Sequence, residues 1–339
     1  MTFGRVARGV GLAVVATIVL ALVAGFVYQR IASARDAARH TPPGTRLQVD
    51  GRAVHVLCRG SGSPPVVVVP GSGSGTIDWQ PAQRVLAQDR RVCSYDRPGY
   101  GWSDPRRDAG RPDAVVRDLD RVVRHALGGS AGDGPTAGTV VLLGHGFGGS
   151  YARLYAQRRP DRVAGLLLVD ARHEEARERL PGGIVALEDR TESAWRGVRV
   201  LAHLGLVRLF APLLHEAPDL PADALDAYWA QLARPAFFAA TAAERGRLEE
   251  VERTLREADA YAMAALPTVV LRHGRDDMFG SHPDAEAAER TWRRLQEDLA
   301  RRAGGAPLLV AEDAGHDVHL ERPGALRRAL ASLDALLAR

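Results

Sequence analysis

Many hydrophobic positions of this chain gather in short runs, separated by stretches of mixed character. Such runs occupy residues 65–70, 91–96, 140–143, 163–169, 267–271 and 307–311. A run of this length that is rich in Val and Leu predicts a strand covered on both faces of a sheet. Between the runs, apolar residues recur at helical spacing, as at Val115, Leu119 and Val122. Strands that alternate with helices predict a mostly parallel sheet.

Two stretches depart from this alternation. Residues 46–58 alternate apolar and polar positions around an Asp-Gly pair, which predicts a β-hairpin. Residues 171–266 are mostly helical in pattern and carry several aromatic side chains. We therefore expect a core built from residues 45–172 and 267–339, with residues 173–266 inserted as a helical lid. Most aromatic residues of this insert are expected to pack in its own core.

The first residues of the chain have a different pattern. The segment from Val10 to Tyr28 carries no charge, and it follows the basic residues Arg5 and Arg8. As a helix of about 19 residues it would be about 28 Å long, close to the thickness of a bilayer core. Residues 1–34 are therefore predicted to be a membrane anchor or signal segment, with the membrane as a partner.

Two interpretations of this segment remain open. It can be an uncleaved anchor that holds the domain outside the cytoplasm, or a signal peptide whose small residues at 32–34 are a cleavage site, leaving a secreted protein. The apolar run is longer than a usual signal-peptide core, which favours the anchor. Arginines on both sides of the run leave its orientation open. Residues 35–44 are expected to form a short stalk.

Composition narrows the possible functions. All 45 basic residues are Arg, and the formal net charge is +4. The absence of Lys excludes a P-loop lysine and a Schiff-base lysine. Because the arginines alternate with Asp and Glu, they predict a salt-bridged surface and no nucleic-acid partner. No Cys, His and carboxylate spacing suggests a metal site, and we expect no cofactor.

A glycine-rich corner carries the candidate chemistry. The apolar run at 140–143 leads into Gly144, Gly146 and Gly148, and a helical pattern follows at once. Strand, tight turn and helix are the setting of the nucleophile elbow, whose usual form is G-x-S-x-G. Both flanking glycines match this form, but Gly146 stands where the form has serine.

Three further stretches match one known arrangement. They are residues 69–73 after an early strand, Asp277 three residues after a glycine that follows a late strand, and His316 after the last strand. Together with the corner they resemble the α/β-hydrolase fold family over about residues 45–335. The order of elbow, acid and histidine is that of this fold.

The resemblance implies a fold and a set of roles. The fold would be a mostly parallel eight-stranded sheet flanked by helices, with a helical lid inserted. Gly146 would occupy the nucleophile position, Asp277 would be the acid, and His316 would be the base that the acid orients. The backbone N–H groups of Ser72 and Phe147 would form the oxyanion hole. The ligand would be a small apolar acyl compound.

Other residues near these positions have alternative roles. Asp170 ends the preceding strand and is the alternative acid, because some family members place the acid there. His145 is expected to be structural. Ser150 lies one helical turn beyond the corner, so its hydroxyl should point elsewhere. Ser74 is expected to serve as a turn residue.

A glycine at the corner leaves three hypotheses open. In the first hypothesis, no acyl-enzyme forms without a hydroxyl at Gly146, and the protein is a weak or inactive relative of ester and amide hydrolases that still binds a ligand. Alternatively, His316 activates a water molecule as general base. In the third hypothesis Gly146 is an engineered or erroneous replacement, and the natural protein is an ordinary serine hydrolase. A binding or receptor-like protein is the non-enzymatic alternative.

The chain has two cysteines, Cys58 and Cys93. Two small buried residues are one interpretation. In the fold implied by the resemblance, however, their strands would be neighbours in the sheet. An even pair in an exported chain makes a disulfide plausible. We therefore predict a bond between Cys58 and Cys93.

Overall fold

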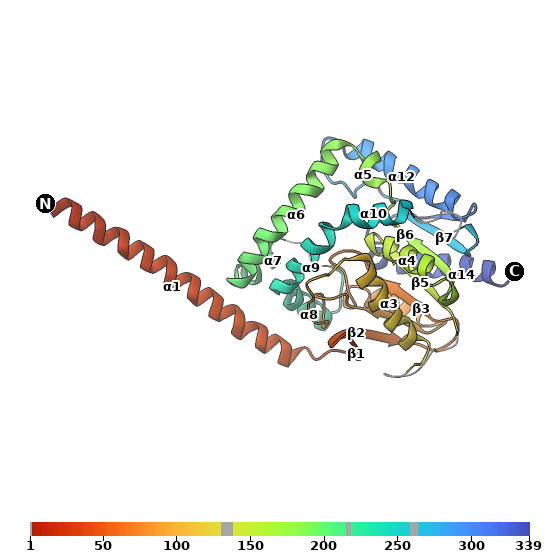
Figure 1. Cartoon of the computed structure of the whole chain (residues 1–339), viewed down its shortest axis with the longest axis horizontal. Coiled ribbons are helices and arrows are strands. Elements are labelled where there is room, and N and C mark those ends of the chain that lie inside the picture. The colour runs from red at the N-terminus through yellow and green to blue at the C-terminus, as the bar shows by residue number, and fades with distance from the viewer. Residues whose placement is uncertain (1, 130–137, 215–217, 258–263) are drawn as a thin grey trace.

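An eight-stranded sheet forms the centre of the computed structural model, which describes residues 2–129, 138–214, 218–257 and 264–339 (Figure 1). Its strands are β1 Thr45–Val49, β2 Arg52–Arg59, β3 Val66–Val69, β4 Val92–Tyr95, β5 Val140–His145, β6 Val163–Val169, β7 Thr268–His273 and β8 Leu308–Ala311. Their spatial order is β1-β2-β4-β3-β5-β6-β7-β8. Strand β2 is antiparallel to β1 and β4, and the pairs from β4 to β8 are parallel. The predicted mostly parallel sheet is thus confirmed.

Helices cover both faces of this sheet. They are α2 Gln80–Leu86, α3 Pro112–Ala126, α4 Phe147–Arg158, α12 Ala285–Arg302, α13 Val318–Glu321 and α14 Pro323–Leu337, with a short 3-10 turn at Pro160–Arg162. In β5, Val140 and Leu142 pack in the cluster that includes α3 and α4. Val141 and Leu143 pack on the other face with α2 and α14. This alternation explains why β5 is apolar throughout: each side chain enters one of two buried layers.

A helical insertion separates β6 from β7. Its helices are α5 Ala176–Arg179, α6 Gly182–His203, α7 Leu206–Leu214, α8 Ala222–Leu232, α9 Pro235–Arg245 and α10 Leu248–Glu257. This is the segment predicted to be an inserted helical lid, apart from the positions that lie outside the described residues. After the insertion the chain returns to the sheet at Thr268, where β7 pairs in parallel with β6.

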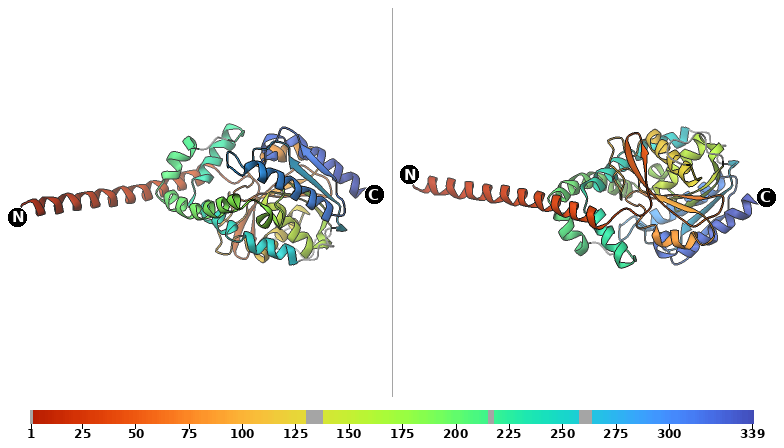
Figure 2. Two further views of the ribbon diagram at one scale, coloured as in Figure 1. Left: turned by 90° about the horizontal axis from the view of Figure 1, so that it is seen from above. Right: turned by 90° about the horizontal axis from the view of Figure 1, so that it is seen from below.

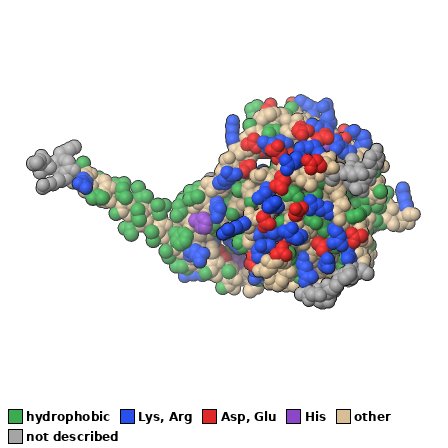
Figure 3. All heavy atoms as spheres, viewed as in Figure 1, with side chains coloured by type: hydrophobic (Ala, Val, Ile, Leu, Met, Phe, Trp, Pro, Cys, Tyr) green, Lys and Arg blue, Asp and Glu red, His purple; other side chains and the backbone are tan. Residues whose placement is uncertain are grey.

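The N-terminal helix α1, Thr2–Arg39, projects from the body on the side of the insertion (Figures 1 and 2). Its apolar side chains are exposed, and they form the green extension of the space-filling view, whose body shows intermixed acidic and basic side chains (Figure 3). The helix is long and apolar enough to cross a membrane. The predicted stalk is helical as far as Arg39. Two ion pairs attach it to the insertion: Asp36 pairs with Arg208 at 2.7 Å, and Arg39 pairs with Asp226 at 3.0 Å.

The two cysteines are joined by a disulfide between neighbouring strands. Cys58 of β2 and Cys93 of β4 are register partners in the antiparallel pair. The bond closes a loop with a sequence separation of 35 residues. It therefore fixes the outer hairpin to the parallel part of the sheet.

We expect that Cys58→Ala together with Cys93→Ala lowers the free energy of unfolding by about 2–4 kcal/mol, since closing a loop of this length restricts the unfolded chain. Chemical denaturation of the oxidised protein and of the double variant measures the difference. The two proteins should unfold alike after the wild type has been reduced. A double variant as stable as the oxidised wild type would contradict a stabilising role for this bond.

Candidate active site

Gly146 lies at the corner between β5 and α4, with backbone angles φ 52° and ψ −124°. Its N–H donates to the carbonyl of Val169 at 3.1 Å, and its own carbonyl accepts from Arg172 N at 2.9 Å. A positive φ of this kind costs a residue with a side chain about 1–3 kcal/mol, whereas glycine adopts it readily. The backbone of this corner would strain a residue with a side chain, but glycine adopts it without strain.

The second glycine of the motif allows the helix to approach the loop after β3. A Cβ on Gly148 would lie 2.1 Å from the carbonyl oxygen of Val69 and 2.2 Å from that of Pro70. Only glycine fits at such a distance. The first turn of α4 therefore packs directly on the loop that contains Ser72.

His316 faces the corner from the loop after β8. Its Nε2 lies 3.2 Å from the point that a Cβ on Gly146 would occupy. Its Nδ1 is 2.6 Å from Oδ2 of Asp170. The imidazole thus has a carboxylate on one nitrogen and the glycine corner at the other, which is the geometry of a base oriented by an acid.

The carboxylate of Asp170 is the centre of a buried hydrogen-bond network. Oδ2 contacts the Nδ1 atoms of His316 and His273 at 2.6 and 2.7 Å, and Oδ1 accepts from Nε1 of Trp292 at 2.9 Å. Burial opposes the charged form, but the bonds to the two histidines outweigh it and hold the pKa of Asp170 far below its usual range. Asp170 also has a positive φ of 44°.

His273 lies between two carboxylates. Its Nδ1 contacts Asp170 at 2.7 Å and its Nε2 contacts Glu289 Oε2 at 3.0 Å, while Glu289 Oε1 accepts from Met278 N at 2.8 Å. Burial alone would lower the pKa of His273, but the bonds to both carboxylates raise it to about 10. A protonated His273 balances one of the two negative charges and leaves the other to stabilise His316 when it accepts a proton.

The assignment of Asp277 as the acid disagrees with this geometry. Asp277 is about half exposed, and its Oδ2 accepts from Arg275 Nε at 2.6 Å. Asp277 and His316 line the same cavity, but the carboxylate that contacts the imidazole is that of Asp170. The reason is the position of β6: its last residues lie beside His316, whereas the loop after β7 turns outward to Arg275. The sequence-based choice of Asp277 was therefore wrong, and the alternative acid occupies the place.

The predicted oxyanion donors border the same cavity as the corner. Phe147 is the first residue of α4, so its N–H lacks a partner within the helix. Ser72 follows Gly71, whose Cα is 4.0 Å from the Cβ point of Gly146. Arg97 fixes this loop, because its guanidinium donates to the carbonyls of Pro70 and Gly71 at 2.5 and 2.7 Å.

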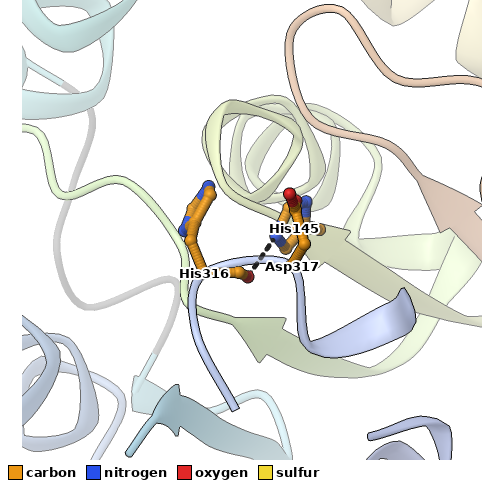
Figure 4. Close-up of side chains that lie close together, drawn as sticks. All are labelled: His145, His316 and Asp317. Carbon is orange, nitrogen blue, oxygen red and sulfur yellow. Dashed lines mark hydrogen bonds between the residues drawn. The ribbon is translucent and has the colours of Figure 1, made fainter. Parts of the chain in front are cut away.

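His145 holds the loop that carries His316 in place through a hydrogen bond. Its Nε2 donates to the backbone oxygen of His316 at 2.9 Å, the contact drawn in Figure 4. Burial, together with the charge of His316, lowers the pKa of His145 to about 3, so its ring is neutral and structural.

His145, His316 and Asp317 have donor atoms close enough to hold a metal ion, as do Asp170, His273 and His316. In the second group the short bonds to Oδ2 already engage both Nδ1 atoms.

Nearby hydroxyls have different environments. Ser150 donates to the carbonyl of Arg172 at 3.2 Å, away from the corner, and Ser74 pairs with Asp78. Ser72 Oγ is buried and has no hydrogen-bond partner among the described residues.

The sequence did not predict three residues of the network around Asp170, which are His273, Glu289 and Trp292. For His273 a signal existed, because it ends a predicted strand next to the strand that Asp170 ends.

A cavity of about 570 Å³ collects these groups. Gly146, Phe147, Ser72 and His316 line it from the core, and the insertion adds residues such as Glu188 and Arg245. The cavity lies at the carboxyl ends of the parallel strands, where ligands bind in open α/β sheets. A small molecule that entered it would meet the imidazole and the two amides together.

Comparison with known proteins establishes the class of this chain. A sequence model described as the alpha/beta hydrolase family matches residues 66–329. The chain therefore belongs to the alpha/beta hydrolase family.

Individual relatives are more distant. An uncharacterized protein of Schizosaccharomyces pombe is 33% identical over 132 residues, which are 38% of this chain and 21% of that protein. The uncharacterized protein YbdG of Bacillus subtilis is 27% identical over 174 residues, half of each chain. The chain thus spans half or less of the length of these relatives. A thermophilic esterase from Thermogutta terrifontis shares the fold, with a TM-score of 0.58 and 22% identity over 86% of this chain and 97% of that one.

The pKa of His316 can show which carboxylate, that of Asp170 or that of Asp277, acts on its imidazole. Burial alone would lower this pKa, but the bond to Asp170 raises it above its ordinary value. We expect Asp170→Asn to lower the pKa of His316, because the imidazolium loses its partner charge. The matched variant Asp277→Asn should leave it unchanged. Titration of the His316 ring by NMR measures both; a drop confined to Asp277→Asn would contradict the assignment.

Proposed function

We propose that this protein is a membrane-anchored alpha/beta hydrolase whose acid and histidine are complete and whose nucleophile is missing. Asp170 orients His316, and the amides of Ser72 and Phe147 form the oxyanion hole. The protein binds an acyl-type ester or amide in the cavity, but forms no acyl-enzyme because Gly146 offers no oxygen. Turnover is therefore weak or absent, and ligand binding is the retained property.

One observation carries this proposal. The Nε2 atom of His316 is 3.2 Å from the Cβ point of Gly146, whose φ and ψ are those of a strained corner. A base aimed at a side chain that is absent is the arrangement expected when the nucleophile alone has been lost. In a serine protease, loss of the nucleophile costs about 10⁶ in kcat, while the oxyanion hole and binding retain about 10³–10⁴ over water.

The location and the role of the insertion belong to the same proposal. Helix α1 anchors the chain, with the domain outside the cytoplasm, where the Cys58–Cys93 disulfide would persist. The alternative is a secreted protein from which α1 has been cleaved. The helical insertion acts as a lid, since it supplies Glu188 and Arg245 to the wall of the cavity.

A second candidate function uses water as the nucleophile. The space beside Gly146 is free of a side chain, and the base next to it is already oriented. His316 would take a proton from a water molecule as the water oxygen attacks the acyl carbon, and would return that proton to the leaving group. In this case any slow hydrolysis by the unmodified chain disappears in His316→Ala.

Gly146→Ser should create ester hydrolysis, because the new hydroxyl would lie next to His316. A side chain at this φ should also lower the free energy of unfolding by about 1–3 kcal/mol. Short-chain nitrophenyl esters measure the activity. Because His316 must be neutral to act as base and its pKa is raised, kcat/KM of the variant should rise with pH through a midpoint above the ordinary value of about 6.5.

Two controls make this test decisive. His316→Ala in the Gly146→Ser background should abolish the gained activity, whereas Asp277→Asn should preserve most of it. A fluorophosphonate probe should label Gly146→Ser at the new serine and leave the unmodified chain unlabelled. Labelling of the unmodified chain at Ser72 or Ser74 would show that another hydroxyl is the nucleophile and would overturn the proposal.

A further inference from the structure

A second cavity lies inside the helical insertion and shares two lining residues, Ser72 and Arg245, with the first. We propose that this chamber takes the acyl chain of a bilayer lipid, which enters beside α1 and places its ester oxygens at Ser72 and Arg245. The inference rests on the proposed function for the membrane anchor and the acyl class of ligand. It concerns binding only and requires no turnover.

The chamber has the size and lining of a site for a hydrocarbon chain. Its volume is about 770 Å³. Helices α6, α7, α8 and α9 enclose it with apolar and aromatic side chains, among them Trp195, Val198, Ala211, Leu232, Phe237 and Phe238. Apolar contact of this kind provides affinity for an acyl chain in proportion to the methylenes that it buries.

Two polar residues connect the chamber to the catalytic cavity. Ser72 and Arg245 line both. Ser72 Oγ and Arg245 Nε are buried and have no hydrogen-bond partner among the described residues. A buried polar group without a partner is costly, so both atoms are suited to bind the oxygens of a ligand. The junction therefore fits the carboxyl end of an acyl group, with its carbonyl near Gly146 and its chain in the chamber.

The lining of the chamber also includes exposed apolar side chains. Leu201 and Phe210 line it, yet 44% and 51% of their surface is exposed. Val200, Leu209 and Leu213 are also exposed. We call these five residues of α6 and α7 the apolar rim. An exposed group of large apolar residues around a cavity is typical of a surface that contacts another apolar phase.

The apolar rim lies next to the C-terminal end of the apolar segment of α1. A Cβ on Gly25 would lie 2.6 Å from the carbonyl oxygen of Leu204, and one on Gly205 would lie 2.7 Å from the ring of Tyr28. Gln29 donates to the carbonyl of Ala233 at 2.9 Å. Leu204 and Gly205 separate α6 from α7, so the α6–α7 turn is level with the last turn of the segment from Val10 to Tyr28.

The same arrangement identifies the bilayer as the occupant of this surface. In Figures 1 and 2, α1 leaves the body where α6 and α7 meet it, and the C-terminus lies at the opposite end. Tyr28 ends the apolar run and Arg30 follows it, as is usual where a helix emerges from a membrane. With α1 in the bilayer, the apolar rim touches the lipid surface, and a chain can pass from the bilayer into the chamber without crossing water.

The experiment uses the full chain in phospholipid nanodiscs that contain a phosphatidylcholine with a diazirine at the end of one acyl chain. After irradiation, peptide mapping should find label inside the chamber, on α6, α7 and α9. Ala211→Trp, which fills the chamber from its wall, should reduce this label at least about tenfold, since the buried methylenes contribute roughly fourfold each. Arg245→Gln should weaken it by roughly tenfold through the loss of a charged hydrogen bond.

Two further variants test the route of entry. Leu201→Glu with Phe210→Glu should remove chamber labelling in nanodiscs. The matched control is Leu187→Glu, since Leu187 is an equally exposed residue of α6 that does not line the chamber. It should label like the wild type. The thermal unfolding of each variant checks that the fold is retained.

The outcomes separate this inference from the proposed function. Label confined to α1, or equal chamber labelling with and without the rim substitutions, would overturn it. A crosslink between two copies through the apolar rim would show that the surface is a protein interface and would overturn it as well. If Gly146→Ser hydrolyses soluble esters while the chamber stays unlabelled, the proposed function stands and this inference fails.

Discussion

The carboxylate of Asp170 is the point on which the arrangement of the site depends. It ends β6, and it holds His316 from the loop after β8, His273 from β7 and Trp292 from α12 through bonds of 2.6 to 2.9 Å. A fully buried carboxylate is costly unless its lone pairs are satisfied, and here they are. The network therefore fixes the imidazole and also fastens the last two strands to α12.

Glycine at the corner between β5 and α4 leaves this network undisturbed. Gly146 needs no support for its positive φ, so the turn survives without the strain that a serine would add. Gly148 still allows the close packing of α4 on the loop after β3, and Arg97 still holds that loop. A glycine at this corner is thus compatible with a stable fold, and the cavity and His316 keep their places beside it.

Much of the fold was predictable because it follows from local pattern. The buried runs became β3 to β8, and the hairpin became β1 and β2, since each pattern reports which faces are covered. The acid was not predictable in this way. Asp170 and Asp277 both follow strands, and their separation depends on how the loop after β7 turns toward Arg275. The role of His273 depends likewise on Glu289, which lies 16 residues away on α12.

A buried ion pair couples the insertion to the loop after β3. Arg97 contacts Glu244 at 2.5 Å, and both side chains are 2% exposed. Through its other nitrogens Arg97 holds the carbonyls of Pro70 and Gly71, next to Ser72. Glu244 belongs to α9, and the following residue, Arg245, stands between the two cavities.

Breaking such a pair by removing one partner costs about 3–5 kcal/mol. A ligand that displaced α9 would therefore also displace the loop after β3, which lies next to the corner. By the same contact, a chain seated in the chamber with its oxygens at Arg245 would leave α9 in place and keep Ser72 aligned with Phe147 and His316.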